Sequence, residues 1–450
     1  MGRNRATARL IRAGETGFHE ACMATLFNQR TPAQFPTALF LARSVEDIQE
    51  ALGIARQERL RVSIVSGGHS WSANHMRADT LVIDMSRFDA FAVDRASMRA
   101  LAGPGCYGHE LLLALVKQGL FFPTGHCKGV CLGGYLLKGG FGWHSIELGL
   151  ACESVVGIDL VTADGDVVHA SETVNPDLYW AARGAGTGFF GVVFRYHLRL
   201  HPKPPTTALA FRSYGLEHLE EVLDWLGKAT GHLSDAVELK LSITPHSPFL
   251  RRPAIDVAAV VFATSWSEAR ARTAFLKQAP SGASLRVPTM PLPMRLLYYL
   301  TSMHYPAGQR WAVDNIWTGA DPIELAPAFR RILDELPPSP SFLHFEYWSG
   351  AGRTRPDMAF SMEDEYFLSV MAAWQDPSDD DRYTRMVAEQ MRALEPLASG
   401  TQLADENLNH RTSRFMSDDN LARLDRLRAD WDATGLFNSW HSRPSPAEAG

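Results

Sequence analysis

Apolar residues recur at helical spacing and in short runs through the first two hundred residues. From Val45 to Glu58 they fall every three or four positions, and Ser44 precedes this run with an acidic residue three positions on, as at a helix N-terminus. Arg61 to Val65 and Leu81 to Asp84 are short apolar runs, the first of them ended by Ser66-Gly67-Gly68. This pattern predicts a helix over 45–58 and strands over 61–65 and 81–84.

A proline-rich joint separates this region from the next. Before it, the apolar face of residues 109–119 predicts a helix that ends at Gly119, and Asp164-Gly165 predicts a hairpin turn between Val155–Ala163 and Val167-Val168. The joint itself is His201-Pro-Lys-Pro-Pro205. Beyond it, strands alternate with amphipathic helices: strands are expected over 259–264 and 366–371, and helices over 268–277 and 382–394.

Composition and charge narrow the class of protein. The 450 residues are 46% hydrophobic and 21% charged, as in a globular chain with a large core. The net charge of −6 argues against a nucleic-acid partner. No run reaches the roughly 18 apolar residues of a membrane helix, and the N-terminal residues lack the apolar core of a signal peptide. We therefore expect no nucleic acid, no membrane and a cytoplasmic location.

The chain has five cysteines, an odd number that argues against a disulfide framework and for reduced thiols. Cys127 and Cys131 lie near His126 and His144 in the sequence, but their spacing matches no standard zinc pattern. No metal site is expected. The other cysteines are Cys22, Cys106 and Cys152.

Two familiar motifs occur in incomplete form. Gly103-Pro-Gly-Cys-Tyr-Gly108 has the glycine spacing of a dinucleotide-binding loop, but residues 122–129 hold no acidic residue to bind a ribose. Gly68-His-Ser-Trp-Ser72 follows a predicted strand like a hydrolase nucleophile elbow, but Ser72 replaces the closing glycine and no helix is expected after it. A nicotinamide cofactor is therefore rejected, and a hydrolase with Ser70 as nucleophile is kept only as a rival hypothesis.

Glycines are densest between residues 125 and 142. Because glycine lets the backbone approach a ligand closely, this density favours a bound cofactor whose phosphates are held by backbone N–H groups. Tight internal packing is the alternative, and it could account for one Gly-Gly pair. The glycines are Gly125, Gly129, Gly133, Gly134, Gly139, Gly140 and Gly142.

These motifs resemble the FAD-binding domain of the vanillyl-alcohol-oxidase/PCMH superfamily. The resemblance rests on Ser66-Gly-Gly-His-Ser70, on Gly125-x-Cys127 with the glycines after it, and on Ala182-Arg-Gly-Ala-Gly-x-Gly-Phe-Phe-Gly-Val-Val193. Within the superfamily the chain is most similar to the berberine-bridge-enzyme-like oxidases, whose closing segment resembles Trp431-Asp-Ala-Thr-Gly-Leu-Phe-Asn438. The resemblance is strong over residues 35–203, thin through the middle, and returns near the C-terminus.

The resemblance implies covalently bound FAD. His69 would bond to the flavin 8α-methyl group and Cys127 to C6, and two such links would hold the flavin in an open site for bulky substrates. Val130 falls at the position thought to control access of O₂, and a valine there resembles oxidases. The remaining implied cofactor contacts are Ser66, Gly67, Gly68 and Ser70 around the pyrophosphate, and Gly125, Gly133, Gly134, Gly139, Gly140, Gly142, Val193 and Asn438.

The chain departs from the family where a catalytic tyrosine is expected. The family carries Tyr-x-Asn near the C-terminus, whereas this chain has Gln402 and Ala404 at those positions. Glutamine cannot act as a general base, because it has no titratable proton near neutral pH. The residues considered for that role are Tyr347 and Asp405, followed by Glu363, Glu365 and Tyr366.

The expected fold is α+β, with a PCMH-type FAD-binding domain and an antiparallel-sheet substrate domain. We expect the FAD-binding domain over residues 1–203, the substrate domain over 204–399, and a C-terminal segment over 400–450 that returns to the FAD-binding domain. The resemblance implies an oxidase that takes a hydride from an alcohol or amine carbon of a small molecule (an alcohol, sugar or phenolic) and is reoxidised by O₂ to give H₂O₂. The alternatives are a dehydrogenase of the same fold with another acceptor and a flavin-binding protein without turnover.

Overall fold

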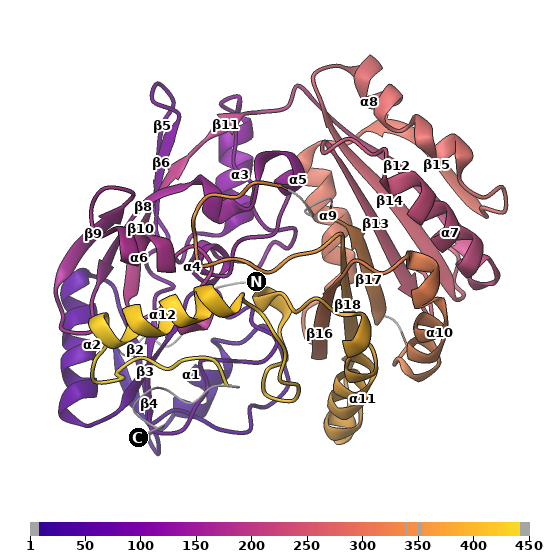
Figure 1. The fold of residues 1–450 in the computed structure, drawn as a ribbon. Coiled ribbons are helices and arrows are strands. Elements are labelled where there is room, and N and C mark those ends of the chain that lie inside the picture. Colours follow the sequence, from indigo (N-terminus) through magenta and orange to yellow (C-terminus); the bar gives the residue numbers. More distant parts are fainter. Residues whose placement is uncertain (1–8, 339, 349–352, 442–450) are drawn as a thin grey trace.

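Two bodies of secondary structure lie side by side in the computed structural model, an N-terminal part and a large sheet with its helices (Figure 1). The structure describes residues 9–338, 340–348 and 353–441. Within these ranges no helix is both long and apolar enough to cross a bilayer.

The N-terminal part begins with a four-stranded sheet whose last three strands are parallel. The Ser44 hydroxyl accepts a hydrogen bond from the Asp47 amide at 3.2 Å, which caps the first long helix and confirms the prediction for residues 45–58. The strands expected over 61–65 and 81–84 are also confirmed. In sheet order the strands are β1 (Leu10–Arg12), β2 (Ala38–Leu41), β4 (Thr80–Asp84) and β3 (Arg61–Val65), and the helices are α1 (Phe18–Met23) and α2 (Val45–Gln57).

A five-stranded antiparallel sheet completes the N-terminal part. The expected hairpin is present as β8 and β9, paired through the Asp164-Gly165 turn. Gly103 follows an antiparallel strand, whereas a dinucleotide-binding loop lies in a parallel βαβ unit, so the rejection of that motif stands. In sheet order the strands are β5 (Phe91–Asp94), β6 (Arg99–Ala102), β10 (Val192–Arg199), β8 (Val155–Val161) and β9 (Val167–Ser171). The helices are α3 (Gly108–Val116), α4 (Leu132–Leu137), α5 (Ser145–Leu148) and α6 (Pro176–Ala181), and β7 (Leu120–Phe121) pairs with β11 (His201–Pro202).

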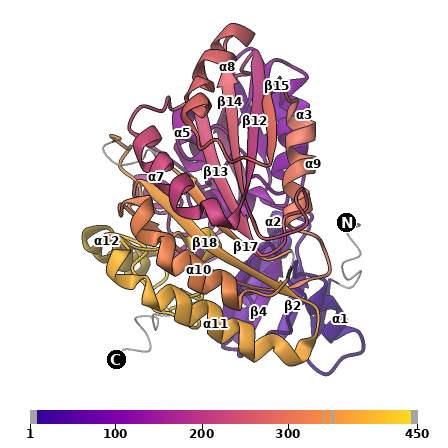
Figure 2. The same ribbon diagram turned by 90° about the vertical axis from the view of Figure 1, so that its right-hand side faces the viewer.

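The second body is a seven-stranded antiparallel sheet with helices on one face (Figure 2). The predicted elements at 259–264, 366–371 and 382–394 overlap β14 (Ala254–Ala263), β18 (Tyr366–Trp374) and α11 (Asp380–Ala393), the first and third predictions running one residue too far. The helix expected over 268–277 is α8 (Trp266–Arg272) followed by a 3₁₀ turn. In sheet order the strands are β15 (Leu285–Pro291), β12 (Thr206–Gly215), β14 (Ala254–Ala263), β13 (Val237–Thr244), β17 (Phe342–Tyr347), β18 (Tyr366–Trp374) and β16 (Arg310–Thr318). The covering helices are α7 (Leu219–Thr230), α8 (Trp266–Arg272), α10 (Ala326–Glu335) and α11 (Asp380–Ala393), while α9 (Met294–His304) packs between β14 and the N-terminal part.

Side chains of β17 alternate between the two faces of this sheet. Leu343 and Phe345 belong to the core beneath the helices, whereas Phe342 packs in a separate cluster on the other face. Because successive side chains of a strand point to opposite faces, His344 and Glu346 share the face of Phe342. That face is turned toward the N-terminal part.

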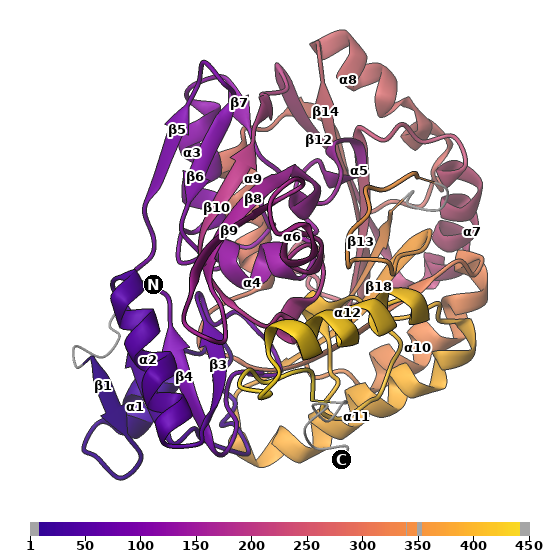
Figure 3. The ribbon, with the colours of Figure 1, turned by 60° about the vertical axis from the view of Figure 1, so that its left-hand side comes forward.

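The C-terminal residues return to the N-terminal part (Figure 3). Helix α12 (Asp418–Trp431) packs near α6, and the Asn438 amide donates to the Val62 carbonyl at 2.9 Å. The hydrophobic core of the N-terminal part contains residues from 38–200, Ala359 and residues from 403–440. The hydrophobic core between the large sheet and its helices contains residues from 208–394. We keep the division at 203 and 399 as our interpretation; residues 1–8, 339, 349–352 and 442–450 lie outside the described part.

Candidate functional site

A large cavity lies between the two bodies. With its open mouth it encloses about 1750 Å³ of empty space, part of which is open solvent. Its walls come from β3 and the turn after it, residues 125–141, β10, strands β17 and β18, and the segments 402–405 and 437–439. A long, two-part ligand would therefore touch both bodies.

The turn after β3 presents unpaired backbone amides to this cavity. Residues 66–70 all line the cavity, and within the described part of the chain the amides of residues 67–70 donate to no protein group. Gly68 has φ +70°, and a Cβ there would overlap the carbonyl oxygen of Thr25. Only glycine fits this position, and the resulting turn leaves N–H donors available for an anionic ligand.

His69 and Cys127 come from separate segments and line the same cavity. The His69 ring stacks on Phe27, with centroids 4.2 Å apart, and burial lowers its pKa to about 4, so the imidazole is neutral at pH 7. A Cβ on Gly129, two residues after Cys127, would lie 2.9 Å from Cδ2 of His69. The chain after Cys127 therefore passes directly against the His69 ring.

Cys127 is a thiol rather than a thiolate in this environment. Burial, and then the charge of Asp405, raise its pKa to about 12. Thiolate character, on which the reactivity of a cysteine depends, is thus not supplied by the protein. All five cysteines are free, and Cys127 is the one among them that is only half-buried.

Six of the seven dense glycines divide into two groups, and the seventh, Gly129, lies against the His69 ring. Gly125, Gly133 and Gly134 line the cavity, and a Cβ on Gly134 would meet no protein atom within 4 Å. Gly139, Gly140 and Gly142 lie outside its lining, where a Cβ would collide with Phe360, Ala151 and Thr124 respectively. Internal packing therefore accounts for the second group. Val130, Val193 and Asn438 line the cavity.

Comparison with known proteins identifies the family. Residues 36–171 match the FAD binding domain family. The FAD-linked oxidoreductase nodO of Hypoxylon pulicicidum is 32% identical over 419 residues, which cover 92% of each chain. This chain belongs to the FAD-linked oxidoreductases.

One further relative and one solved structure are similar to this chain. The carbohydrate oxidase of Microdochium nivale is 37% identical over 182 residues, 40% of this chain and 36% of that one. The structure of Physcomitrella patens BBE-like 1 superposes with a TM-score of 0.85 and 20% identity over 97% of each chain, which shows a shared fold. The family resemblance and the α+β, PCMH-type fold class are confirmed.

The cavity of this FAD-linked oxidoreductase fits FAD. The unpaired amides of residues 67–70 suit a pyrophosphate, and the open face of Gly134 leaves room for a ligand against the backbone. The neutral imidazole of His69 and the thiol of Cys127 stand in the same wall. When bound, the flavin would supply the redox chemistry, and the protein would supply binding and orientation.

Gln402, at the family's tyrosine position, and Asp405, one of the candidate bases, both reach the cavity. Gln402 is fixed by Asn315, whose Oδ1 accepts from the Gln402 amide at 2.7 Å and whose Nδ2 donates to its carbonyl at 3.0 Å. Asp405 accepts a 2.7 Å hydrogen bond from Nε1 of Trp71, and burial raises its pKa above the usual range. Both residues line the cavity.

Tyr347 does not reach the cavity. As an odd-numbered residue of β17 it packs against the core beneath the helices, 5.7 Å from the ring of Tyr366. Tyr366 faces the same core and shares a 2.8 Å hydrogen bond with Thr230. Glu363 accepts from Nε1 of Trp348 and pairs with an arginine, and neither it nor Glu365 lines the cavity.

A buried ionic network, which sequence reasoning missed, lies on the cavity side of β13 and β17. Lys240 and Glu346 are cross-strand neighbours, with Nζ 3.4 Å from Oε1. The Lys240 Nζ also lies 2.9 Å from Oε2 of Glu238. Two histidines carry the network to the cavity wall: His126 Nε2 lies 2.6 Å from Lys240 Nζ, and His344 Nε2 lies 3.1 Å from Glu346 Oε2.

The charges of this network follow from burial and pairing. Burial opposes ionisation of Glu238 and Glu346, but Lys240 and the histidines outweigh it and lower both carboxyl pKa values, that of Glu238 to about 2. Burial likewise opposes the ammonium form of Lys240, yet the two carboxylates raise its pKa. Burial and the charge of Lys240 lower the pKa of His126, which is therefore neutral at pH 7.

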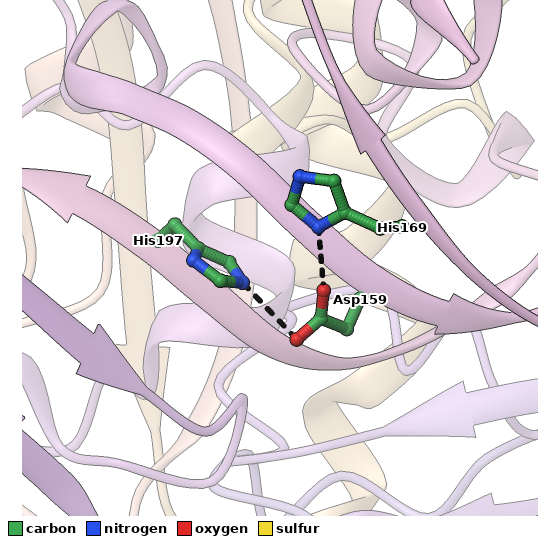
Figure 4. A group of neighbouring side chains, drawn as sticks. All are labelled: Asp159, His169 and His197. Carbon is green, nitrogen blue, oxygen red and sulfur yellow. Dashed lines mark hydrogen bonds and ion pairs between the residues drawn. The ribbon is translucent and has the colours of Figure 1, made fainter. Parts of the chain in front are cut away.

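Among the described residues, the cysteines and histidines considered as zinc ligands form no ligand cluster. The one group of three side chains there that could bind a metal is Asp159, His169 and His197 (Figure 4). Asp159 Oδ1 lies 2.7 Å from His169 Nδ1, and Oδ2 lies 3.0 Å from His197 Nε2. These are hydrogen-bond distances. The guanidinium of Arg195 adds a positive charge 3.4 Å from the same carboxylate. Hydrogen bonds account for this group, and we assign no metal to it.

The hydrolase hypothesis lacks its structural context. Residues 71–79 form turns that lead directly into β4, whereas a nucleophile elbow continues into a helix. The Ser70 hydroxyl lies 3.3 Å from the Ser72 hydroxyl, and Ser72 donates to Glu406 at 2.7 Å. No histidine is in place to activate Ser70 among these contacts of the described chain.

Proposed function

We propose that this chain is an oxidase with covalently bound FAD that removes a hydride from an alcohol or amine carbon of a small molecule and passes the electrons to O₂, giving H₂O₂. The observation that carries the proposal is the meeting of His69 and Cys127 in one cavity wall beside the amide-lined turn. A sugar is the favoured kind of alcohol, because relatives include a carbohydrate oxidase.

Attachment through His69 has the stronger physical support. Its neutral imidazole is the form that can attack the flavin methyl group, and stacking on Phe27 holds the ring in place. Cys127 would be a second link, formed from a protonated thiol, so it would depend on a base or on the bound flavin for activation.

Side chains around the cavity would orient the substrate. The Gln402 side-chain oxygen accepts from the Ala404 amide at 3.0 Å, which leaves its amide N–H₂ group as a hydrogen-bond donor toward a substrate oxygen. Asp405 would add a negative charge or, when protonated, a donor. Val130 would line the path of O₂, and Tyr305, Phe141 and Phe367 would provide apolar contact for a ring.

The first test is peptide mass spectrometry of the acid-denatured, yellow protein. We expect FAD mass on the peptide that contains His69, and on the Cys127 peptide if both links form. Cys127→Ala should abolish the second link, whereas Cys106→Ala, at a buried cysteine outside the cavity lining, should not. A protein that binds no flavin would overturn the proposal.

The second test is the reaction of the reduced protein with O₂. Stopped-flow mixing of substrate-reduced protein with air-saturated buffer should regenerate the flavin spectrum rapidly and release H₂O₂. Slow reoxidation with fast transfer to a quinone dye would indicate a dehydrogenase. Failure of alcohols, sugars, phenolics and amines to reduce the flavin would indicate a flavin-binding protein without turnover. A cytoplasmic location remains a prediction.

A further inference from the structure

We propose that His344 is the general base of this enzyme, that Glu346 orients it, and that His126 acts as the hydrogen-bond donor to the substrate oxygen or nitrogen. The proposal rests on the proposed oxidase function and concerns the same cavity. It supplies the base that the chain lacks at Gln402. It follows from the way that the buried network fixes the hydrogens on the two histidines.

Glu346 determines which nitrogen of His344 can accept a proton. The carboxylate is ionised, because Lys240 and His344 outweigh the burial that opposes its charge. An ionised carboxylate accepts hydrogen bonds only, so Nε2 of His344, 3.1 Å away, carries the hydrogen of the neutral ring. Nδ1 then holds the lone pair, and the ring that carries it lines the cavity.

Lys240 imposes the opposite arrangement on His126. Nε2 of His126 lies 2.6 Å from the Lys240 ammonium and 3.5 Å from Oε2 of Glu238. The nearer group, the ammonium, has hydrogens and no lone pair, so Nε2 is the acceptor. Nδ1 of His126 therefore carries the hydrogen and is a donor. The ring stays neutral because burial and Lys240 both disfavour its protonation, and it also lines the cavity. One lysine thus separates a basic histidine from a donating one.

Other cavity groups are less suited to accept a proton. Burial raises the pKa of Tyr305 well above its ordinary value, so it remains a phenol. Cys127 is a protonated thiol, and Gln402 does not titrate. Burial raises the pKa of Asp405 above its ordinary value, but Oδ1 of this carboxyl already accepts a 2.7 Å hydrogen bond from the Trp71 indole. His344 Nε2 lies 3.1 Å from the Glu346 carboxylate, which can stabilise the protonated ring, whereas His126 Nε2 has the Lys240 ammonium at 2.6 Å and the Glu238 carboxylate farther away, at 3.5 Å.

The step balances with the groups named. The substrate C–H bond breaks and its electron pair leaves with the hydride that the oxidised flavin accepts. The substrate O–H or N–H bond breaks as its proton moves to Nδ1 of His344, and a C=O or C=N bond forms. Glu346 stabilises the imidazolium until the proton is released to solvent. Glu238, Lys240, His304 and Asp405 are the other titratable groups facing these two histidines.

The kinetic test is flavin reduction measured by stopped flow across the pH range. His344→Asn should slow reduction by about 10²–10⁴-fold, the usual contribution of a general base, and should remove the fall in rate toward acidic pH. Glu346→Gln, which removes the carboxylate that positions His344, should lower the rate and shift the pH at which the rate falls toward acidic pH. His218→Asn, at a half-buried histidine outside the cavity lining that pairs with Glu221, is the matched control. An unchanged rate and pH profile in His344→Asn would overturn the proposal.

Rescue separates lost chemistry from lost folding. His344→Ala opens a space for exogenous imidazole, which should restore part of the reduction rate if the ring acts as a base. Circular dichroism and flavin content should match those of the unaltered protein. A folded, flavin-loaded His344→Ala variant that imidazole does not rescue would count against the base assignment.

A second readout needs no substrate. Nitrogen-15 NMR of histidine-labelled protein distinguishes the two neutral tautomers, and the spectra of His344→Asn and His126→Asn assign the signals. We expect the Nε2–H tautomer at His344 and the Nδ1–H tautomer at His126, and Glu346→Gln should alter the first. The reverse tautomers would overturn this proposal. If no substrate reduces the flavin but the tautomers are as expected, the oxidase function fails and the network assignment stands.

Discussion

The indole Nε1 of Trp71 donates a 2.7 Å hydrogen bond to Oδ1 of Asp405, across 334 residues of sequence. One residue further on in each segment, the Ser72 hydroxyl donates to Glu406 at 2.7 Å. Two adjacent bonds thus tie the turn after β3 to the segment at 402–406, which also carries Gln402. The wall that would hold the cofactor and the wall that would hold the substrate are joined here.

Trp71→Phe should destabilise the protein and leave Asp405 without its donor. The loss of a hydrogen bond to a buried carboxyl costs about 1–3 kcal/mol, and the pKa of Asp405 should rise further because this bond lowers it. Urea unfolding measures the effect. Trp266→Phe is the control, since Trp266 is 39% exposed, and it should change little. Equal stability of the two variants would show that the bond contributes nothing.

Gly134→Ala and Gly139→Ala should separate cofactor binding from folding. Gly139 has φ +100° and a Cβ would lie 2.9 Å from Phe360, so alanine there should lower the melting temperature. Gly134 lies in α4 with its Cβ direction open to the cavity, so alanine should keep or raise stability but reduce flavin content. Visible absorbance per mole of protein measures flavin content. Full flavin loading of Gly134→Ala would show that no cofactor lies against this glycine.

Arg411→Met should be among the most damaging single changes. Arg411 Nη2 and Nε lie 2.7 and 2.8 Å from the two carboxylate oxygens of Asp314, and both side chains are buried. Removing one partner of such a pair costs about 3–5 kcal/mol, because it leaves an uncompensated charge. Arg382→Met, at a pair with a 70% exposed arginine, should cost less than about 1 kcal/mol. Denaturant unfolding of both variants tests the contrast.

The protein should lose stability as the pH falls from about 6.5 toward 4, and His144→Asn should reduce that loss. Burial lowers the pKa of His144 to about 4, while the unfolded chain binds the proton near pH 6.5. The unfolded state is therefore protonated first, and the contribution of this histidine is present above pH 6.5 and lost below it. Asparagine suits the left-handed backbone of this residue, φ +64°.

The test is to measure the melting temperature as a function of pH and to compare the slopes of the unaltered protein and the variants. His144→Asn should show a shallower slope between pH 6.5 and 4, with His218→Asn unchanged as the control. The slope should not vanish, because burial also lowers the pKa values of other histidines to about 4. These are His69, His201 and His441. A slope identical to that of the unaltered protein would contradict the prediction.

Local sequence signals were sufficient to predict several helices and strands. The Ser44 cap of α2 depends on a residue three positions away, and the β8–β9 hairpin depends on its own Asp-Gly turn. Such signals act within a few residues, so they can be recognised without the fold. The motifs at residues 66–70 and 125–134 likewise predicted segments that the structure brings to one cavity.

The glycines show where sequence was ambiguous. Gly134 and Gly139 belong to the same dense run, yet one faces open space and the other faces Phe360, more than 200 residues away. A position can require glycine either because a ligand lies against the backbone or because another part of the chain does. Only the packing distinguishes the two cases.

The sequence by itself determined the family and the cofactor class; the alternation of polar and apolar residues in β13 and β17 is recognised in it once these strands are known. In both strands polar residues such as Lys240 and Glu346 alternate with apolar ones, a pattern typical of a sheet with one solvated face. The tertiary structure decided that this face is covered by His126 and its neighbours from the N-terminal part. Burial depends on which distant segments meet, and burial is what turns a polar strand face into an ordered network of charges and oriented histidines.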